Sequence, residues 1–447
     1  MLNGIQGYIP TMLMKLGLSD GMLQFLSDPK LVLPTLVFIN IWFGAPMIMV
    51  NVYAALQTVP QDQYEAALID GASSWQSFIH ITVPHIKVVV GLLVVLRTIW
   101  VFNNFDIIFM TTAGGPASMT TTMPLYIYDL GWTNKLVGRA SAASIILLAF
   151  LIAVCLIYFA VITHWEKEDW ACKKGRRFGD IVSNVYLILL SIVAVFPLLW
   201  LLVSAFKSSS EMLNNPTKIW PIQWTLENFK TVLFTLKFTV NIRNSLIIAG
   251  STTVVAIIIS SLAAYGVVRF FPKLGNVMTK ILVTTYMFPS IMLVIPYAMV
   301  MAKLNLTNTR IGLMLVYLSF SVPYAVWMLV GFFKTVPIGI EEAARIDGAN
   351  KLQVFVRIVL PLVSPGIVAT AIYVFINAWN EYLYSMILMS SSDKTTISVA
   401  VKTLEGADIL NWGSLMAACA IVVVPSIIFF CFIQNKMAGG LSDGAVK

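Results

Sequence analysis

The chain contains 447 residues, of which 58% are hydrophobic and only 11% are charged, and its mean hydropathy is +0.84. This composition excludes an ordinary water-soluble domain and predicts an all-α polytopic membrane protein, because lipid cannot satisfy exposed backbone polar groups and spanning segments must therefore be helices. The formal net charge of +8 fits basic loops at a lipid surface and does not indicate nucleic-acid binding, since no basic and aromatic stripe lies in a soluble region.

The chain opens with a mixed, loop-like segment, 1–30, that has no cleavable signal pattern. Apolar stretches long enough to span a bilayer follow, and their lengths predict about nine transmembrane helices. The predicted spans are 31–56, 88–110, 142–162, 181–206, 245–268, 281–301, 311–333, 367–389 and 415–433.

The loop between the first and second spans, 60–85, predicts a short helix-turn-helix. Residues 65–69 are good helix formers, and Gly71 suits a left-handed helix end. Ser73 lies three residues before Gln76, which is the spacing of a capping box that starts a second helix. Taken alone, this loop would be an ordinary cytoplasmic connection with well-capped helices.

A basic linker, 166–179, follows the third span. It holds the densest positive cluster of the chain, formed by Lys167, Lys173, Lys174, Arg176 and Arg177. Because basic loops stay on the cytoplasmic side, we expect the linker to be cytoplasmic. Counting spans outward from it places loop 60–85 and the later loop 337–361 on the cytoplasmic side as well.

Loop 337–361 repeats loop 60–85 without a gap. Each residue of the first copy, such as Glu65, lies 277 positions before its counterpart, here Glu342, and the register extends upstream to Pro46 and Pro323. A repeat of this length is far beyond chance and has to be interpreted before any local feature. Two copies in the same topological place argue against a mere connection, and we expect both to dock a partner.

Polar side chains interrupt two of the predicted spans at related positions. The second span carries Arg97, Asn103, Asn104 and Asp106, and its counterpart carries Asn377, Asn380 and Glu381 beside Tyr373, Trp379, Tyr382 and Tyr384. Amides and aromatic rings at membrane depth suit a hydroxylated solute, although hydrogen bonds between helices are the alternative interpretation. The candidates for the solute path are Asn103, Asn104, Asn377, Trp379, Asn380, Glu381 and Tyr382, whereas we expect Arg97 to pair internally.

Other chemistry is not indicated. No Gly-x-x-x-x-Gly-Lys-Ser/Thr phosphate loop occurs, so the chain should not bind ATP itself. The three histidines and four cysteines show no metal-ligand, disulfide or nucleophile spacing. We therefore predict neither a cofactor nor a metal, and no enzymatic activity.

The sequence resembles the permease subunits of ABC importers of the carbohydrate-uptake group, which serve maltose, oligosaccharides and glycerol phosphate. Both loops match that family's Glu-Ala-Ala…Asp-Gly-Ala…Leu-Pro coupling motif, and the Asp before the Gly favours the sugar group. Segments similar to the first permease of a pair are Phe102-Asn103-Asn104-Phe105-Asp106, Gly114-Gly115-Pro116, Tyr126-Ile127-Tyr128 and Ala140-Ser141-Ala142. Segments similar to the second are Trp379-Asn380-Glu381-Tyr382, Ser391-Ser392-Asp393-Lys394 and the tail from Gly440 to Lys447.

The resemblance implies a binding-protein-dependent ABC permease fold in a bacterial-type cell (inner) membrane. Its partners would be two ABC ATPase subunits, an extracytoplasmic solute-binding protein and membrane lipid, and a complete first permease subunit is a further candidate. The coupling role carries over to Glu65, Ala66, Ala67, Asp70, Gly71, Ala72, Glu342, Ala343, Ala344, Asp347, Gly348 and Ala349.

The resemblance also implies a division into modules. Residues 1–165 would be the C-terminal part of a first permease with three spans, 166–179 the linker, and 180–447 a complete second permease with six spans. The family usually has about six spans per permease by the same span-length criterion. A natural fusion and a gene-model artefact both fit this expectation.

Two further interpretations remain open on the sequence alone. A secondary transporter or channel built from repeats would use intramembrane carboxylates such as Asp106 and Glu381 for ion coupling, without an ATPase. The chain could instead be a truncated, inactive permease fusion. Within the leading interpretation, glycerol-3-phosphate or a polyol competes with an oligosaccharide as the solute.

Overall fold

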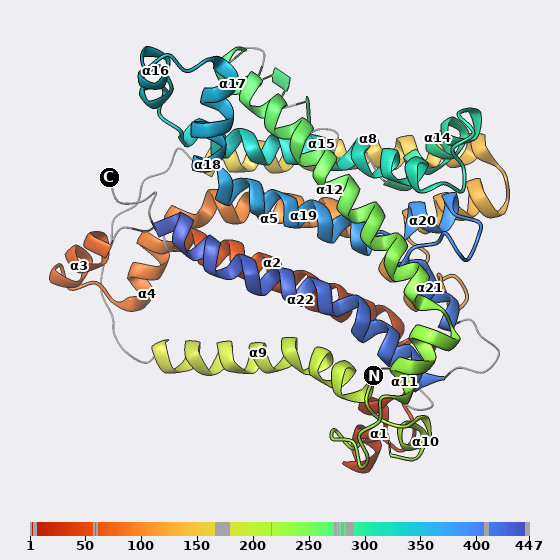
Figure 1. Ribbon diagram of the computed structural model, residues 1–447. Helices are drawn as coiled ribbons and strands as arrows, with labels where there is room; N and C mark the ends of the chain where they lie inside the picture. Colours follow the sequence, from red (N-terminus) through yellow and green to blue (C-terminus); the bar gives the residue numbers. More distant parts are fainter. Residues whose placement is uncertain are drawn as a thin grey trace. The chain divides into compact units, whose positions relative to one another are not determined.

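The computed structural model describes residues 2, 7–56, 59, 61–165, 179–215, 217–271, 275, 277–278, 281–282, 290–405 and 411–442. Every secondary-structure element in these residues is helical, which confirms the predicted all-α fold (Figure 1). The chain divides into two compact units, Met1–Gln223 and Trp224–Lys447, which are described separately.

In the first unit, long helices alternate with short ones. The long helices are α2 (Val32–Leu56), α5 (Val83–Phe102), α8 (Val137–Trp165) and α9 (Gly179–Ser204). The short helices are α1 (Tyr8–Lys15), α3 (Gln61–Ile69), α4 (Ser74–Ser77), α6 (Asp106–Thr111), α7 (Met123–Tyr128) and α10 (Ser209–Asn214), with π-helical turns η1 (Phe78–Thr82) and η2 (Asp129–Thr133). Helix α5 packs against both α2 and α8.

The N-terminal segment corrects one expectation. Segment 1–30 was predicted to be loop-like, whereas Tyr8–Lys15 forms helix α1. The reason is a tertiary contact, because the buried ring of Tyr8 packs against Phe196 and Trp200 at centroid distances of 5.5 and 6.2 Å. Contacts so distant in sequence leave no local signal.

The second unit is organised around α12 (Phe238–Arg269), which packs against α15 (Arg310–Thr335) and α19 (Ser364–Asn380). The other helices are α11 (Glu227–Lys230), α14 (Ser290–Lys303), α16 (Ile338–Ile346), α17 (Lys351–Val354), α18 (Leu360–Leu362), α20 (Leu383–Leu388), α21 (Ile397–Glu405) and α22 (Trp412–Ser442), with π-helical turns η3 (Thr231–Thr235) and η4 (Phe355–Val359). Small residues explain the central place of α12. Ala249, Ala256, Ser260 and Ala264 are fully buried along it, and small side chains let neighbouring backbones approach closely.

A helix occupies the place of each predicted span, in the order α2, α5, α8, α9, α12, α14, α15, α19 and α22. Within the described residues, four helices are long and apolar enough to cross a membrane, or up to six if each of two bent helix pairs is one span. The bent pairs are Ser74–Lys87 with Val89–Phe102, at 58°, and Lys351–Leu362 with Ser364–Asn380, at 76°. The multi-pass helical fold is thus confirmed, while the count of nine spans stays a prediction.

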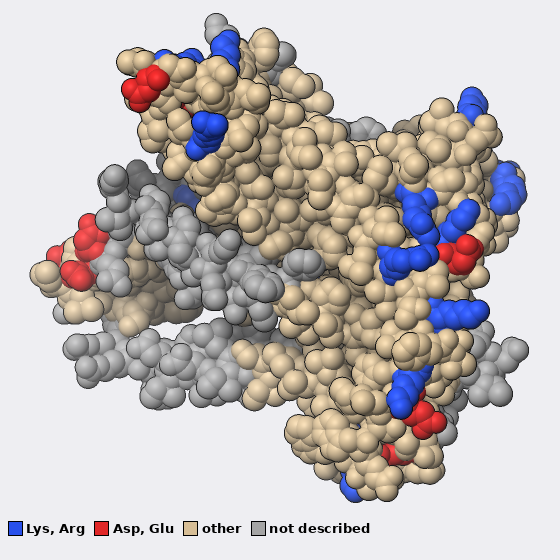
Figure 2. All heavy atoms as spheres, viewed as in Figure 1, with Lys and Arg blue, Asp and Glu red and all other residues tan. Residues whose placement is uncertain are grey.

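Charged side chains are distributed unevenly over the second unit. Figure 2 shows acidic and basic groups over α16 and α17 at one end of the unit and around α20 and α21 at the other, with an uncharged surface between them. This is the pattern that a membrane-spanning bundle requires, because charges are costly at bilayer depth.

Two of the sequence predictions fall on segments that the structure does not describe. The basic cluster of the linker, 166–179, lies outside the described residues except for Gly179, so its cytoplasmic placement stays a prediction. The tail that resembles the second permease lies outside them from residue 443 onward.

Candidate functional site

The two repeated loops fold alike, element by element. Helices α3 and α16, helices α4 and α17, and turns η1 and η4 begin and end 277 positions apart, so the repeat in sequence is also a repeat in structure. The predicted helix-turn-helix is confirmed in both copies. The π-helical turn that continues the second helix was not predicted, since periodicity does not distinguish it from an α-helix.

Local hydrogen bonds fix the turn in both copies. Gly71 and Gly348 adopt left-handed backbone angles, with φ of +81° and +90°, at the ends of α3 and α16. In the first copy, the Gln76 N–H donates to Ser73 Oγ at 3.1 Å, and the Ser73 N–H donates to Gln76 Oε1 at 3.1 Å. Asn350 and Gln353 form the same reciprocal pair at 2.8 Å in both directions. Both predicted capping boxes are present.

Each loop exposes the same apolar positions. Ile69 and Ile346 are both 86% exposed, and Trp75 and Leu352 are both 68% exposed. Both loops therefore present large apolar side chains at matched positions.

The predicted coupling residues divide into exposed and buried members. Ala67 and Ala344 are buried at matched positions, and Gly71 is buried as well, whereas Ala72 and Ala349 are partly buried. The exposed members are Glu65, Ala66, Asp70, Glu342, Ala343, Asp347 and Gly348.

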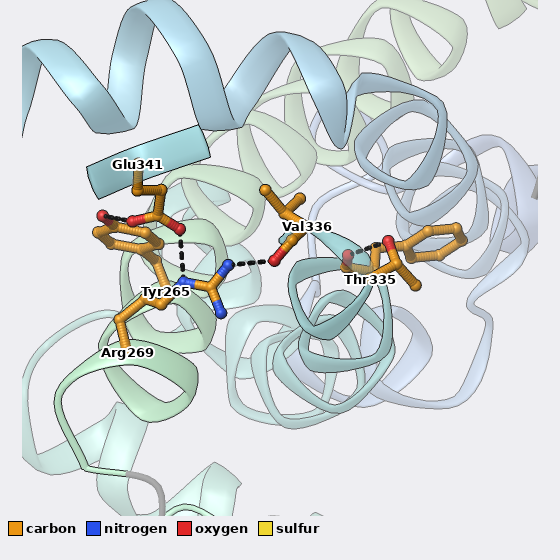
Figure 3. A network of polar contacts seen from close by, with 6 residues as sticks. Tyr265, Arg269, Thr335, Val336 and Glu341 are labelled. Carbon is orange, nitrogen blue, oxygen red and sulfur yellow. Dashed lines mark hydrogen bonds and ion pairs between the residues drawn. The ribbon is translucent and has the colours of Figure 1, made fainter. Parts of the chain in front are cut away.

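The second loop is fastened to α12 by a buried polar cluster, shown in Figure 3. Glu341 accepts from Arg269 Nε at 2.5 Å and from the Tyr265 hydroxyl at 2.7 Å, and Arg269 Nη2 donates to the Val336 carbonyl oxygen at 2.6 Å. The side chains of Arg269 and Glu341 are only 10% and 3% exposed. Phe355 packs on Tyr265 at a centroid distance of 4.8 Å. These contacts join α16 directly to one end of α12.

The first loop is held differently. Tyr64 occupies the repeat position of Glu341, and its hydroxyl bonds to Thr82 Oγ1 at 2.7 Å within the same loop. Val59 and Ile86 form a small core beside it. Sequence reasoning missed the Glu341 cluster, because its contacts join residues 72 and 76 positions apart. The signal that could have pointed to it was a second glutamate directly before the motif.

The polar residues of the interrupted spans form a second repeated feature. Asn104 Nδ2 donates to Asn40 Oδ1 at 2.9 Å, and at the equivalent repeat positions the Tyr317 hydroxyl donates to Glu381 Oε2 at 2.5 Å. Asn104 Oδ1 also accepts the Ile107 N–H at 3.2 Å. These contacts stabilise the backbone where the helix is interrupted after α5 and after α19. Asn40 and Tyr317 were missed, since neither lies near the polar residues in sequence.

The remaining solute-path candidates have diverse surroundings. Trp379 is 1% exposed and its Nε1 donates to the Val422 carbonyl oxygen at 3.1 Å, and Tyr382 is 2% exposed. Asn377 is exposed and donates to the Tyr373 carbonyl oxygen at 2.9 Å. Asn380 is exposed, and Asn103 is half-buried. The structure thus brings Asn104 and Glu381 to equivalent positions, and packs Trp379 and Tyr382 inside the second unit.

Arg97 makes the internal contact that was expected of it. Its guanidinium donates to the Asn40 carbonyl oxygen and lies against Gly44, where an added Cβ would come within 2.5 Å of three guanidinium atoms. Arg97 and Asn104 line a cavity of about 840 Å³ between α2 and α5. Within the described residues, no group of three or more His, Cys, Asp or Glu side chains is arranged to hold a metal ion.

Membrane-length apolar helices, joined by repeated capped loops and broken at polar bends, define a multi-pass membrane protein of the transport class. The family model described as "binding-protein-dependent transport system inner membrane component" matches residues 8–168 and 256–441. The chain belongs to this family of ABC importer permeases.

Curated relatives agree with this assignment. The chain is 31% identical over 280 residues to a diacetylchitobiose uptake system permease protein of Streptomyces coelicolor, covering 62% of this chain and 92% of the relative. It is 33% identical over 274 residues to an inner membrane ABC transporter permease protein of Escherichia coli, covering 61% and 98%. It is 35% identical over 264 residues to a trehalose/maltose transport system permease protein of Thermococcus litoralis, covering 58% and 94%.

A solved structure shares the fold. It is a bacterial ABC transporter involved in the import of the acidic polysaccharide alginate, with a TM-score of 0.51 and 22% identity, covering 58% of this chain and 96% of that chain.

Proposed function

We propose that the chain is the permease of an ATP-driven sugar importer, in which loops 60–85 and 337–361 receive two ABC ATPase subunits. The observation that carries the proposal is the matched fold of the two loops and the equal exposure of their protruding isoleucines. Ile69 and Ile346 protrude equally from them. Nucleotide-driven closure of the ATPases would move both loops and change the access of the solute cavity.

The proposed solute is a sugar delivered by an extracytoplasmic solute-binding protein. The names of two relatives specify diacetylchitobiose and trehalose/maltose uptake. The neutral amide groups of Asn40 and Asn104, which line the cavity of the first unit, suit hydroxylated solutes. A glycerol phosphate or polyol is the second candidate for the solute. The family match argues against a secondary transporter or channel.

The proposed modules are 1–165 and 180–447, joined by the linker 166–179. Two separate family matches and the repeat support this division. A complete first permease subunit is a candidate partner under this proposal, and an inactive fusion is the outcome that a transport assay would reveal.

Gly348 provides the test of the proposed function. The full chain is co-expressed with an ABC ATPase subunit and a solute-binding protein of the maltose type, and maltose uptake and ATP hydrolysis are measured in proteoliposomes. Gly348→Val is expected to abolish stimulated uptake, because φ of +90° is strained for any side chain and the bend between α16 and α17 must change.

Gly339→Asp is the matched control. Gly339 has no atom within 4 Å of an added Cβ, and Asp62 already occupies its repeat position in the first loop. We expect this variant to keep uptake. Uptake by the full chain without any ATPase, or equal activity of both variants, would contradict the proposal.

A further inference from the structure

An apolar groove runs along one face of α2. The cavity of about 840 Å³ is lined on α2 by residues three or four positions apart, which lie on one side of the helix. These residues are Leu33, Leu36, Val37, Asn40, Ile41, Gly44, Ala45, Ile48, Met49 and Val52. Several are open, and Ile41 is 61% exposed.

The internal repeat identifies what covers the same face in the second unit. At the repeat spacing of 277 positions, Ala45 corresponds to Val322 and Ile48 corresponds to Ala325. The Val322 carbonyl oxygen accepts from Ser260 Oγ of α12 at 3.3 Å, and Ala325 belongs to a buried cluster with Ala256 of α12.

Further contacts extend this correspondence along the helix. Leu33 corresponds to Arg310, whose Nε donates to Asn244 Oδ1 of α12 at 3.0 Å. Arg97 on the other wall corresponds to Val374, which lies in the buried cluster with Ala256. The groove of the first unit is therefore the surface that α12 covers in the second.

The polar groups of the groove argue against lipid as its occupant. Arg97 and Asn104 line it, and a cation or amide that faces acyl chains is costly. Within the described residues, no ion pair between Arg97 and a carboxylate is found. Arg97 thus places a cation in the first unit where the second unit has the apolar Val374.

We infer that this groove binds a membrane-spanning helix that presents the chemistry of the α12 face covering the equivalent groove in the second unit. Such a helix presents small residues to α2, as Ala256 and Ser260 do, and carries a carboxylate at the level of Arg97. The inference rests on the repeat and does not depend on the solute or on the ATPases.

A crosslinking experiment tests the register. The full chain, with its four native cysteines replaced, carries Ala45→Cys and is reconstituted in nanodiscs. The probe is a synthetic peptide of residues 238–269 with Ser260→Cys and Ala256→Glu. We expect a short thiol crosslinker to join Ala45→Cys to this probe about tenfold more efficiently than it joins Phe43→Cys, which lies on α2 outside the groove.

Two further variants keep the test decisive. Arg97→Leu is expected to lower crosslinking of the Ala256→Glu probe but not of a probe that keeps Ala256. Ile48→Cys with a probe carrying Ala256→Cys supplies a second pair in case Ala45→Cys does not fold.

Three results would overturn the inference. The first is that Phe43→Cys crosslinks to the probe as efficiently as Ala45→Cys does. The second is efficient crosslinking of Ala45→Cys to a probe that carries Val254→Cys, on the outward face of the helix. The third is crosslinking between two copies of the chain that added probe does not reduce. The last would show that a second copy covers the groove.

Discussion

At the scale of single residues, the two loops differ in how the side chain at one repeat position anchors them. Glu341 ties the second loop to α12, whereas Tyr64 closes the first loop on itself through Thr82. A buried charge that loses its partner is strongly destabilising, because the remaining ion keeps its desolvation cost. Without Glu341, the buried Arg269 would lack its ion-pair partner.

Glu341→Gln is therefore expected to destabilise the second unit by about 3 kcal/mol, the scale for removing one partner of a buried pair. The measurement is thermal unfolding of the purified chain in detergent. Glu342→Gln is the matched control, since this neighbouring carboxylate is exposed, and we expect a change within about 0.5 kcal/mol. Equal effects of the two variants would show that the cluster carries no stability.

At the scale of elements, α12 has polar clamps at both ends. Its 32 residues extend over roughly 48 Å. At one end Tyr265 and Arg269 hold the loop of α16, and at the other Asn244 Nδ2 donates to the Asp393 carbonyl oxygen at 2.8 Å. Figure 1 shows α12 running between these two regions of the second unit.

This arrangement predicts energetic coupling between distant residues. In the transport assay, Asn244→Ala and Glu341→Gln are each expected to lower the number of solute molecules transported per ATP hydrolysed. The double variant should lower this ratio by less than the sum of the two single effects, because one rigid helix connects both contacts. Ser251→Ala is the control, since the Ser251 hydroxyl donates within α12, to the Ile247 and Ile248 carbonyl oxygens. Additive effects would exclude α12 as the connection.

Locality decides which elements could be predicted from sequence. The capping boxes of α4 and α17 and the turns at Gly71 and Gly348 were predicted, because all of their contacts lie within a few residues. The Tyr317–Glu381 contact was not, since its partners are 64 positions apart. Trp379 was selected as a solute-path candidate by its type, whereas it is buried and donates to the distant Val422 carbonyl oxygen.

At the scale of the whole molecule, the proposed function requires both loops to face the cytoplasm. Their placement rests on the basic linker and on the counting of spans. The matched exposure of Ile69 and Ile346, both 86%, makes this requirement testable with equivalent reporters.

Single cysteines at Ile69 and Ile346, in a chain without its native cysteines, are expected to react with a membrane-impermeant maleimide in inside-out vesicles and not in intact spheroplasts. Ile222 is 56% exposed and lies between the fourth and fifth predicted spans, a segment that the same counting of spans places on the outer side, so Ile222→Cys should show the opposite pattern. Equal exposure means that the two loop reporters should label at similar rates, so a difference in sidedness cannot be attributed to local burial. Labelling of the two loops from opposite sides would rule out a pair of ATPases acting on both, because such motors work from one face of the membrane only.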